Sequence, residues 1–251
     1  MKILLTNDDG INAPGLYALY KEFIKTEEVN IVAPDSEKSA VGHAITLSDP
    51  LRVTNFYKND FFFGYAVNGT PADCVKLAYW ALDIKPDIVI SGINLGSNTG
   101  INILYSGTVS AATEGMFLDV PSIAISLTTF HNPDFRFAAR FAHRLSKIVI
   151  EHGLPKGTLL NINVPAIPEE EIEGVVITRQ GHANYQEKFD KRIDPHKRVY
   201  YWLTGTKIEL EQDNEVDDRA ILDKKISITP VQFDLTNYGF MAELKSWNIQ
   251  L

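Results

Sequence analysis

Short apolar runs alternate with longer segments of helical periodicity over the first two-thirds of this 251-residue chain. The runs show little polar alternation, which is typical of strands buried on both faces of a parallel sheet. Amphipathic helices between such strands would cover the two faces. The pattern therefore predicts an α/β fold with a doubly wound, mostly parallel, Rossmann-like sheet. The predicted strands are residues 3–5, 29–34, 51–56, 61–67, 86–92, 121–127 and 158–165, and the predicted helices are residues 15–26, 70–83, 106–118 and 133–153.

The character of the chain changes at about Gly181, where charged residues become dense. Strand-like pieces occur at Val199–Leu203 and Lys207–Leu210, and a strand at 226–236 and a closing helix at 238–248 follow them. The chain shows no internal repeat and no low-complexity linker. We therefore expect one continuous domain, with an α/β core at residues 1–180 and an extended β arm, a strand and a C-terminal helix at residues 181–251.

Composition limits the class of partner. The formal net charge is -8, which argues against a nucleic-acid polymer as partner because such a partner needs a broad basic surface. A small anionic substrate remains compatible with this charge. Cys74 is the only cysteine, so no intrachain disulfide can form. The N-terminus lacks a basic and apolar leader and no stretch approaches transmembrane length, so we expect no membrane partner and a cytoplasmic location.

Two adjacent carboxylates, Asp8 and Asp9, stand where the first apolar run ends in the stretch LLTNDDG. Like charges repel each other, and a single Asp or Asn would serve a turn equally well. One interpretation is a solvated turn. The other is a pair of carboxylates gathered around a cation, whose charge offsets their repulsion.

Three unusual loops follow predicted strands, at residues 7–15, 33–43 and 91–108. Ligands of open α/β sheets bind outside the carboxyl ends of the strands, so these loops should meet at one edge. Their candidate ligand atoms are all oxygens, and no cysteine or paired histidine stands near them. The donor set favours Mg²⁺ or Mn²⁺ over zinc. The candidate residues are Asp8, Asp9, Ser39, Asn94 and Asn98.

The stretch Ser106-Gly107-Thr108 precedes a helix that we expect to begin near Val109. Free backbone N–H groups and hydroxyls at a helix N-terminus can hold an anion such as phosphate. The alternative is ordinary helix capping, which Ser and Thr perform in most helices. The stretch is not a Walker A loop, because the Gly-Lys-Ser/Thr sequence is absent.

The combined pattern resembles the SurE (survival protein E) family of metal-dependent nucleotidases. NDDGINAPG, VAPDSEKSAVGHAITL, VNGTPADCVKLA, PDIVISGINLGSN, YSGTVSAATEG, LNINVP, TRQGHANY and SITPVQFDLT occur in the order in which the family has them. The resemblance implies a phosphomonoesterase that acts on nucleoside 5′- and 3′-monophosphates and in some members on short polyphosphate. It implies homodimers or homotetramers with exchanged C-terminal segments, in which a partner subunit could cover the aromatic residues Tyr200, Tyr201 and Trp202.

The same resemblance assigns roles to individual residues. It implies one divalent cation per subunit, Mg²⁺ or Mn²⁺, and the metal ligands it implies are Asp8, Asp9, Ser39 and Asn94. The phosphate-side residues it implies are Asn98, Ser106, Gly107 and Thr108. Asp8 and Asp9 would be the catalytic residues, through a metal ion that neutralises the phosphate and activates a water.

Two departures from the family pattern are visible. Ala40 stands where many members have glycine, and residues 214–225 differ from a common Thr-Asp-containing stretch. We interpret the second departure as bearing on substrate range and assembly, not on the metal site.

Two other functions share part of this sequence pattern. A signalling receiver domain also carries an acidic pair after its first strand, but it needs a later strand-end Asp and a Lys that this chain lacks. A non-catalytic nucleotide or phosphate sensor of the same fold remains open, because binding and turnover would use the same residues. Among the histidines, His43 follows Ser39 in the second loop and His182 lies in the stretch TRQGHANY, and either could approach substrate.

Overall fold

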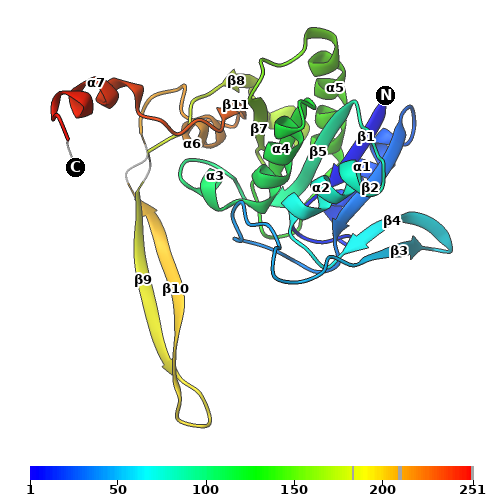
Figure 1. The fold of residues 1–251 in the computed structure, drawn as a ribbon, viewed down its shortest axis with the longest axis horizontal. Helices are drawn as coiled ribbons and strands as arrows, with labels where there is room; N and C mark the ends of the chain where they lie inside the picture. The colour runs from blue at the N-terminus through cyan, green and yellow to red at the C-terminus, as the bar shows by residue number, and fades with distance from the viewer. Residues whose placement is uncertain (183, 209–210, 250–251) are drawn as a thin grey trace.

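The computed structural model describes residues 1–182, 184–208 and 211–249, and its fold is drawn in Figure 1. In the described residues, nine strands form the main sheet. They are β1 (Lys2–Thr6), β2 (Glu28–Pro34), β3 (Val53–Lys58), β4 (Phe61–Val67), β5 (Ile88–Leu95), β6 (Ser122–Leu127), β7 (Thr158–Val164), β8 (Val175–Ile177) and β11 (Ile226–Gln232).

The order across the sheet is β3-β4-β2-β1-β5-β6-β7-β11-β8. Neighbouring strands run parallel except in the pairs β3–β4 and β7–β11, which are antiparallel. The predicted α/β fold with a mostly parallel sheet is therefore confirmed.

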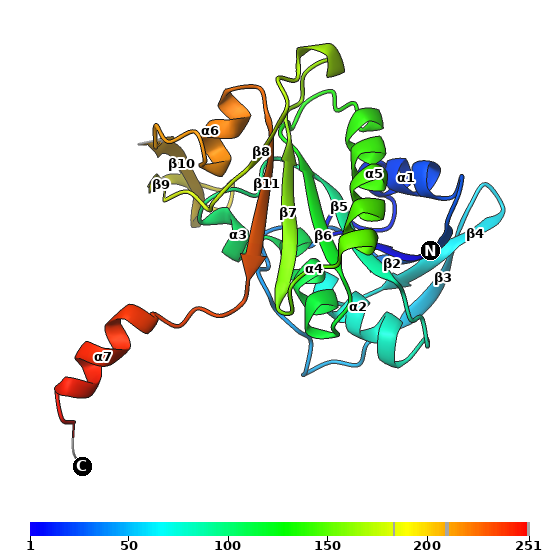
Figure 2. The same ribbon diagram turned by 90° about the horizontal axis from the view of Figure 1, so that it is seen from above.

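Two pairs of helices cover the sheet, as Figures 1 and 2 show. Helices α1 (Pro14–Phe23) and α5 (Arg136–His152) pack on each other, and so do α2 (Pro71–Trp80) and α4 (Gly107–Phe117). Successive strand residues point to opposite faces, so Ile3 and Leu5 join the core cluster under α1 and α5, whereas Leu4 joins the cluster under α2. Burying each such side chain contributes about 1.5–3 kcal/mol.

The sequence explains where α2 begins. Thr70 is its N-cap and Pro71 its first residue, as predicted, and the Thr70 hydroxyl accepts a hydrogen bond from the Asp73 amide. The Asp73 carboxylate in turn accepts from the Thr70 amide, which completes a capping box.

The C-terminal third departs most from expectation. Strands β9 (Asn184–Ile193) and β10 (Val199–Ile208) form a separate antiparallel hairpin that projects from the main body in Figure 1. The two predicted pieces at 199–203 and 207–210 therefore belong to one strand, and residues 209–210 lie outside the described residues. The predicted closing helix is confirmed as α7 (Tyr238–Ser246), which lies apart from the sheet in Figure 2.

The shorter elements have little periodicity and were not predicted. They are α3 (Asn102–Tyr105), the 3₁₀ turn η1 (Glu169–Glu171), β8 and α6 (Asp217–Leu222). None of the helices in the described ranges has the length and apolar character needed to cross a membrane.

The strand order reverses direction at β1. It pairs with β2 on one side and with β5 on the other, both parallel, so the connections diverge there. Such a switch point leaves a crevice outside the carboxyl ends of the two strands, where α/β proteins bind ligands. The segments that follow β1 and β5 contain Asp8, Asp9, Asn98 and Ser106, four of the predicted site residues.

Candidate active site

Asp8 and Asp9 follow the end of β1. Asp8 is buried, and its carboxylate accepts two hydrogen bonds from Thr108, one from the hydroxyl at 2.5 Å and one from the backbone amide at 3.2 Å. Asp9 is partly buried beside it. The Asn7 side chain closes the turn by donating to the carbonyl oxygen of Gly10 at 2.9 Å.

The two carboxylates lie in a setting that opposes their negative charge. Burial raises the pKa of Asp8 above its ordinary value in spite of the bonds from Thr108. Burial, the charge of Asp8 and the charge of Glu37 raise the pKa of Asp9 to about 7. Within the residues that the structure describes, neither carboxylate forms an ion pair with a basic side chain. A divalent cation would supply the missing charge, so the residues fit such an ion.

The second loop is tied directly to this pair. The backbone amide of Lys38 donates to the carbonyl oxygen of Asp8 at 2.7 Å, which brings the next residue, Ser39, to the site. The Ser39 hydroxyl is exposed and donates to the Glu37 carboxylate at 2.7 Å. Ser39 thus presents its oxygen at the edge where Asp8 lies.

Asn94 lies on β5 itself, not in the loop at 91–108 as predicted, because this strand continues to Leu95. Its side-chain nitrogen donates to the carbonyl oxygen of Gly96 at 2.8 Å. This bond fixes the amide so that the opposite atom, Oδ1, is the one suited to a cation.

A pocket of about 240 Å³ gathers most of the predicted residues. Those that line it are Asp8, Ser39, Asn94, Asn98 and Ser106. Asp9, Gly107 and Thr108 adjoin it without being part of its lining. No group of three or more His, Cys, Asp or Glu side chains suited to a metal occurs in residues 1–182, 184–208 and 211–249. A cation at the pocket would therefore bind two carboxylates together with neutral oxygens.

Helix α4 begins against Asp8. It starts at Gly107, two residues before the predicted start, and the hydroxyl of its N-cap Ser106 accepts from the Val109 amide at 3.1 Å. A Cβ atom on Gly107 would lie 2.8 Å from the Cβ of Asp8, so only glycine permits this approach. Thr108 is fully buried and its hydroxyl donates to Asp8 rather than into the pocket.

Asn98 is held by two asparagines of β7 that sequence reasoning missed. Its backbone amide donates to Asn163 Oδ1 at 2.8 Å, and its carbonyl oxygen accepts from Asn161 Nδ2 at 2.7 Å and from Asn163 Nδ2 at 3.2 Å. Its own side chain donates to the Ser126 hydroxyl at 2.9 Å. The available signal was the motif LNINVP, because two asparagines in a buried strand need polar partners.

The two departures from the family pattern both touch this site. Ala40 has a φ of 57°, the left-handed region that favours glycine, and it lines the pocket. Asp217 accepts from the backbone amide of Gly100 at 2.8 Å, and Asp218 accepts from the Thr99 hydroxyl at 2.6 Å. Residues 214–225 thus anchor the loop that carries Asn98, and our interpretation of this departure stays a prediction.

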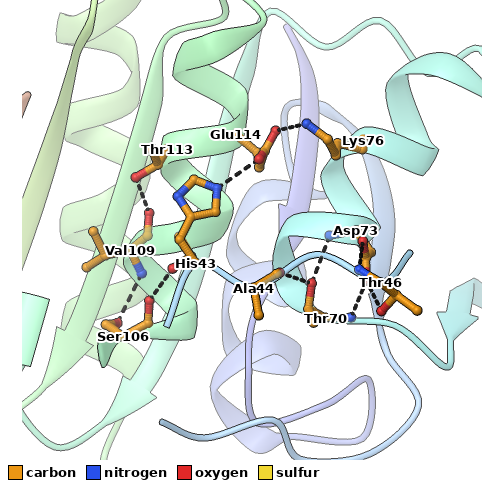
Figure 3. Close-up of polar contacts among 11 residues, drawn as sticks. His43, Ala44, Thr46, Thr70, Asp73, Lys76, Ser106, Val109, Thr113 and Glu114 are labelled. Carbon is orange, nitrogen blue, oxygen red and sulfur yellow. Dashed lines mark hydrogen bonds and ion pairs between the residues drawn. The ribbon is translucent and has the colours of Figure 1, made fainter. Parts of the chain in front are cut away.

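The segment after Ser39 is fastened to α2 and α4, as Figure 3 shows. The His43 imidazole lies 2.8 Å from the buried Glu114 carboxylate, which also accepts from Lys76 at 2.7 Å. Burial would raise the pKa of Glu114, but the bonds from His43 and Lys76 lower it below its ordinary value. The His43 ring therefore has Glu114 as its partner, and it is not part of the pocket lining.

The same segment has a second attachment in Figure 3, at the start of α2. The Thr46 hydroxyl donates to Asp73 at 2.6 Å, and the Thr70 hydroxyl donates to the carbonyl oxygen of Ala44 at 2.8 Å. His182, the other histidine considered, is exposed, and its backbone amide donates to Glu211 at 2.7 Å. It does not line the pocket either.

Comparisons with known proteins all find one family. A profile of the family described as "Survival protein SurE" matches residues 3–187. The chain is 49% identical over 250 residues to "5′-nucleotidase SurE" of Syntrophobacter fumaroxidans, a match that covers 99% of this chain and 100% of that protein. It is 52% identical over 248 residues to "5′-nucleotidase SurE" of Syntrophus aciditrophicus, covering 98% and 93% of the two chains. The crystal structure of the SurE protein from Aquifex aeolicus superposes with a TM-score of 0.85 at 41% identity, covering 99% of this chain and 100% of that one.

Proposed function

This chain belongs to the survival protein SurE family, and on that premise we propose that it is a phosphomonoesterase that hydrolyses nucleoside 5′- and 3′-monophosphates to nucleoside and phosphate. The names of its relatives support a 5′-nucleotidase. The single observation that carries the proposal is the pair Asp8 and Asp9, two carboxylates at the switch point of the sheet that have raised pKa values and lie beside the N-terminus of α4.

The family and the donor set together support a divalent metal cofactor. We assign its ligands as Asp8, Asp9, Ser39 and Asn94, with Mg²⁺ or Mn²⁺ as the ion because the donors are oxygens. When bound, the ion supplies positive charge that offsets the charge of the phosphate and makes a neighbouring water more acidic.

The phosphate would lie between the carboxylates and the start of α4. Asn98 and Ser106 line the pocket there, and the N-terminus of α4 favours an anion. One N–H of the Asn98 amide is used by Ser126, and the amide has a second N–H for a phosphate oxygen. Thr108 contributes indirectly, because its hydroxyl donates to the Asp8 carboxylate and not to the phosphate.

The ester bond breaks, in our proposal, by direct attack of water on phosphorus. Asp9 takes a proton from the water as the new P–O bond forms and the P–O bond to the nucleoside breaks. The leaving nucleoside oxygen takes up a proton from solvent to give the alcohol, and Asp9 returns its proton to solvent. Asp8 is the firmer metal ligand, because Thr108 fixes its carboxylate. The alternative is attack by an aspartate to form an aspartyl-phosphate. Two adjacent carboxylates that share one ion suit the first route better.

One assay separates this enzyme from a non-catalytic sensor of the same fold. Purified protein with Mn²⁺ is mixed with AMP or GMP, and released phosphate is measured. We expect multiple turnovers per subunit. Binding of AMP without phosphate release, with every ion tried, would favour the sensor. Short polyphosphate belongs in the same assay as a further substrate.

We also propose a homodimer or homotetramer that exchanges C-terminal segments at residues 181–251. The hairpin exposes the apolar side chains of Phe189, Ile193, Tyr201 and Trp202, and α7 has no buried residue. Such apolar surface on projecting elements is typical of an interface with another chain. The expected location of this assembly is the cytoplasm.

A further inference from the structure

Two exposed aromatic rings stand at the rim of the candidate pocket. Phe130 is 73% exposed and Tyr105 is 56% exposed, and both line the pocket whose other lining residues include Asp8, Asn98 and Ser106. A single exposed aromatic residue is common on protein surfaces. Two of them in one pocket that also contains Asp8, Asn98 and Ser106 indicate a ligand that has both a charged end and a flat apolar end.

Phe130 is exposed but held in place. It follows the carboxyl end of β6, in a turn closed on both sides, because the Thr129 hydroxyl donates to the His131 carbonyl at 2.9 Å and accepts from the His131 amide at 3.0 Å. Its ring lies on Gly96, where a Cβ atom would come within 2.4 Å of the ring. Gly96 thus leaves room for the ring directly beside the strand end that carries Asn94.

Tyr105 approaches the pocket from the chain segment that leads into α4. It is the last residue of α3 and directly precedes Ser106, the N-cap of α4. Its carbonyl oxygen accepts from the Gly42 amide at 3.0 Å, which ties this position to the loop after β2. Tyr105 is therefore adjacent in sequence to Ser106, one of the proposed phosphate-binding residues.

We propose that Phe130 and Tyr105 form a stacking rim that binds the nucleobase of the substrate. In a nucleotide the ribose separates the phosphate from the base, so a phosphate on the floor of the pocket brings the base to this rim. Every base has a π-face, so stacking accepts purines and pyrimidines alike, with the larger purine ring favoured. This inference rests on the proposed function, and it names the feature by which that site distinguishes nucleotides from other phosphate esters.

The test compares AMP with ribose 5-phosphate, which keeps the sugar and phosphate and lacks the base. We expect Phe130→Ala and Tyr105→Ala each to raise KM for AMP about tenfold or more, the usual effect of losing one base–aromatic contact. The expected change in KM for ribose 5-phosphate is less than about twofold, and kcat for both substrates should stay near wild type, since the rim does not touch the reacting atoms.

Conservative and remote variants serve as controls. Phe130→Trp and Tyr105→Phe keep an aromatic face and should retain the wild-type preference for AMP. Phe62→Ala removes a half-exposed phenylalanine of β4 that lies outside the pocket lining, and it should leave both KM values unchanged. Calorimetric titration of each variant with adenosine gives a readout that does not depend on turnover, and binding should weaken in the two alanine variants at the rim.

The outcomes for the rim and for the proposed function differ. Equal kcat/KM for AMP and ribose 5-phosphate in the wild type, or an equal loss for both substrates in the alanine variants, overturns the stacking rim and leaves the phosphomonoesterase intact. If the wild type, supplied with metal, releases phosphate from neither AMP nor ribose 5-phosphate, the proposed function is wrong. If adenosine also fails to bind to the wild type, the stacking rim is refuted, whatever the phosphate-release assay gives.

Discussion

The hydroxyl of Thr108 donates a 2.5 Å hydrogen bond to the carboxylate of Asp8, 100 residues away in sequence. This contact joins the first turn of α4 to the end of β1. It also gives Thr108 a role that the sequence alone did not indicate, because its partner is a candidate metal ligand and not the phosphate.

Thr108→Val should therefore weaken metal binding rather than substrate binding. A hydrogen bond to a charged group is worth about 1.5–3 kcal/mol, so the Mn²⁺ concentration for half-maximal activity should rise about tenfold or more. Thr108→Ser keeps the hydroxyl and should stay near wild type. The measurement is activity against AMP as Mn²⁺ is titrated. A normal Mn²⁺ requirement with a raised KM for AMP would place the hydroxyl on the phosphate instead.

Removal of the metal should abolish activity reversibly. Two carboxylates with neutral oxygens make an incompletely charged site, so the ion should exchange readily. We expect EDTA to stop phosphate release and added Mn²⁺ or Mg²⁺ to restore it. Asp8→Asn and Asp9→Asn should each lose most activity without a lower unfolding temperature, because burial in the metal-free protein disfavours both charges. Full turnover by chelated, metal-stripped enzyme would rule out the metal site.

Glu27 should make the stability of the fold acid-sensitive. Burial would raise its pKa, but hydrogen bonds from the N-terminal amine, His143 and Thr26 lower the pKa to about 2, from 4.5. A lowered folded-state pKa gives stability that is present above 4.5 and lost as pH falls toward 2. We expect Glu27→Gln to reduce the free energy of unfolding at pH 7 by about 2 kcal/mol, the scale of hydrogen bonds to a charged group.

Urea unfolding of wild type and Glu27→Gln at pH 7 and pH 3 checks this prediction. The difference between the two proteins should shrink at the lower pH, because wild-type Glu27 begins to lose its charge advantage there. A difference that is equal at both pH values would show that the carboxylate contributes by packing alone.

The sequence was most informative where local chemistry determines structure. Thr70, Pro71 and the residues that follow contain a complete helix start, so the position of α2 was predictable. Strand β9 was not, because residues 186–193 are rich in charge and mostly exposed to solvent, so they lack the apolar signal on which strand prediction depends. Its pairing with β10 comes from backbone hydrogen bonds, to which side-chain patterns give little guide.

In the candidate site, too, local sequence signals predicted some residues and gave no information on others. Asp8 and Ser39 were found because oxygen donors followed strand ends, and the pocket brings them together. The residues that hold the loops in place were missed, because contacts such as Asn163 with Asn98 and Asp217 with Gly100 join segments 65 and 117 residues apart. Sequence spacing carries no signal for such pairs. The assigned metal and phosphate roles stay predictions until the variants are measured.

Assembly through the C-terminal third should be visible in solution. The exposed apolar surface of the β9–β10 hairpin and of α7 predicts a dimer or tetramer at micromolar concentration, which light scattering can measure. Replacing Trp202 and Leu203 with Ser and Asn should shift the assembly toward smaller species while leaving the core folded. Lys188→Gln on β9, the strand that pairs with β10, is a matched surface control. A wild-type protein that is monomeric throughout this range contradicts the exchange of C-terminal segments.

The route of ester cleavage gives the last prediction. If water attacks phosphorus directly, no covalent phosphoenzyme forms, and the phosphate passes only to water. If Asp8 or Asp9 attacks, the intermediate is an acyl phosphate that hydroxylamine cleaves and that added methanol can intercept. We expect no acid-stable label on the protein after rapid quench from ³²P-labelled AMP, and no methyl phosphate in the presence of methanol. For Asp8 the two hydrogen bonds from Thr108 favour this outcome, because they hold its carboxylate oxygens at the start of α4. A hydroxylamine-sensitive label would instead assign nucleophilic attack to one of the two aspartates, and comparison of Asp8→Asn with Asp9→Asn would identify which.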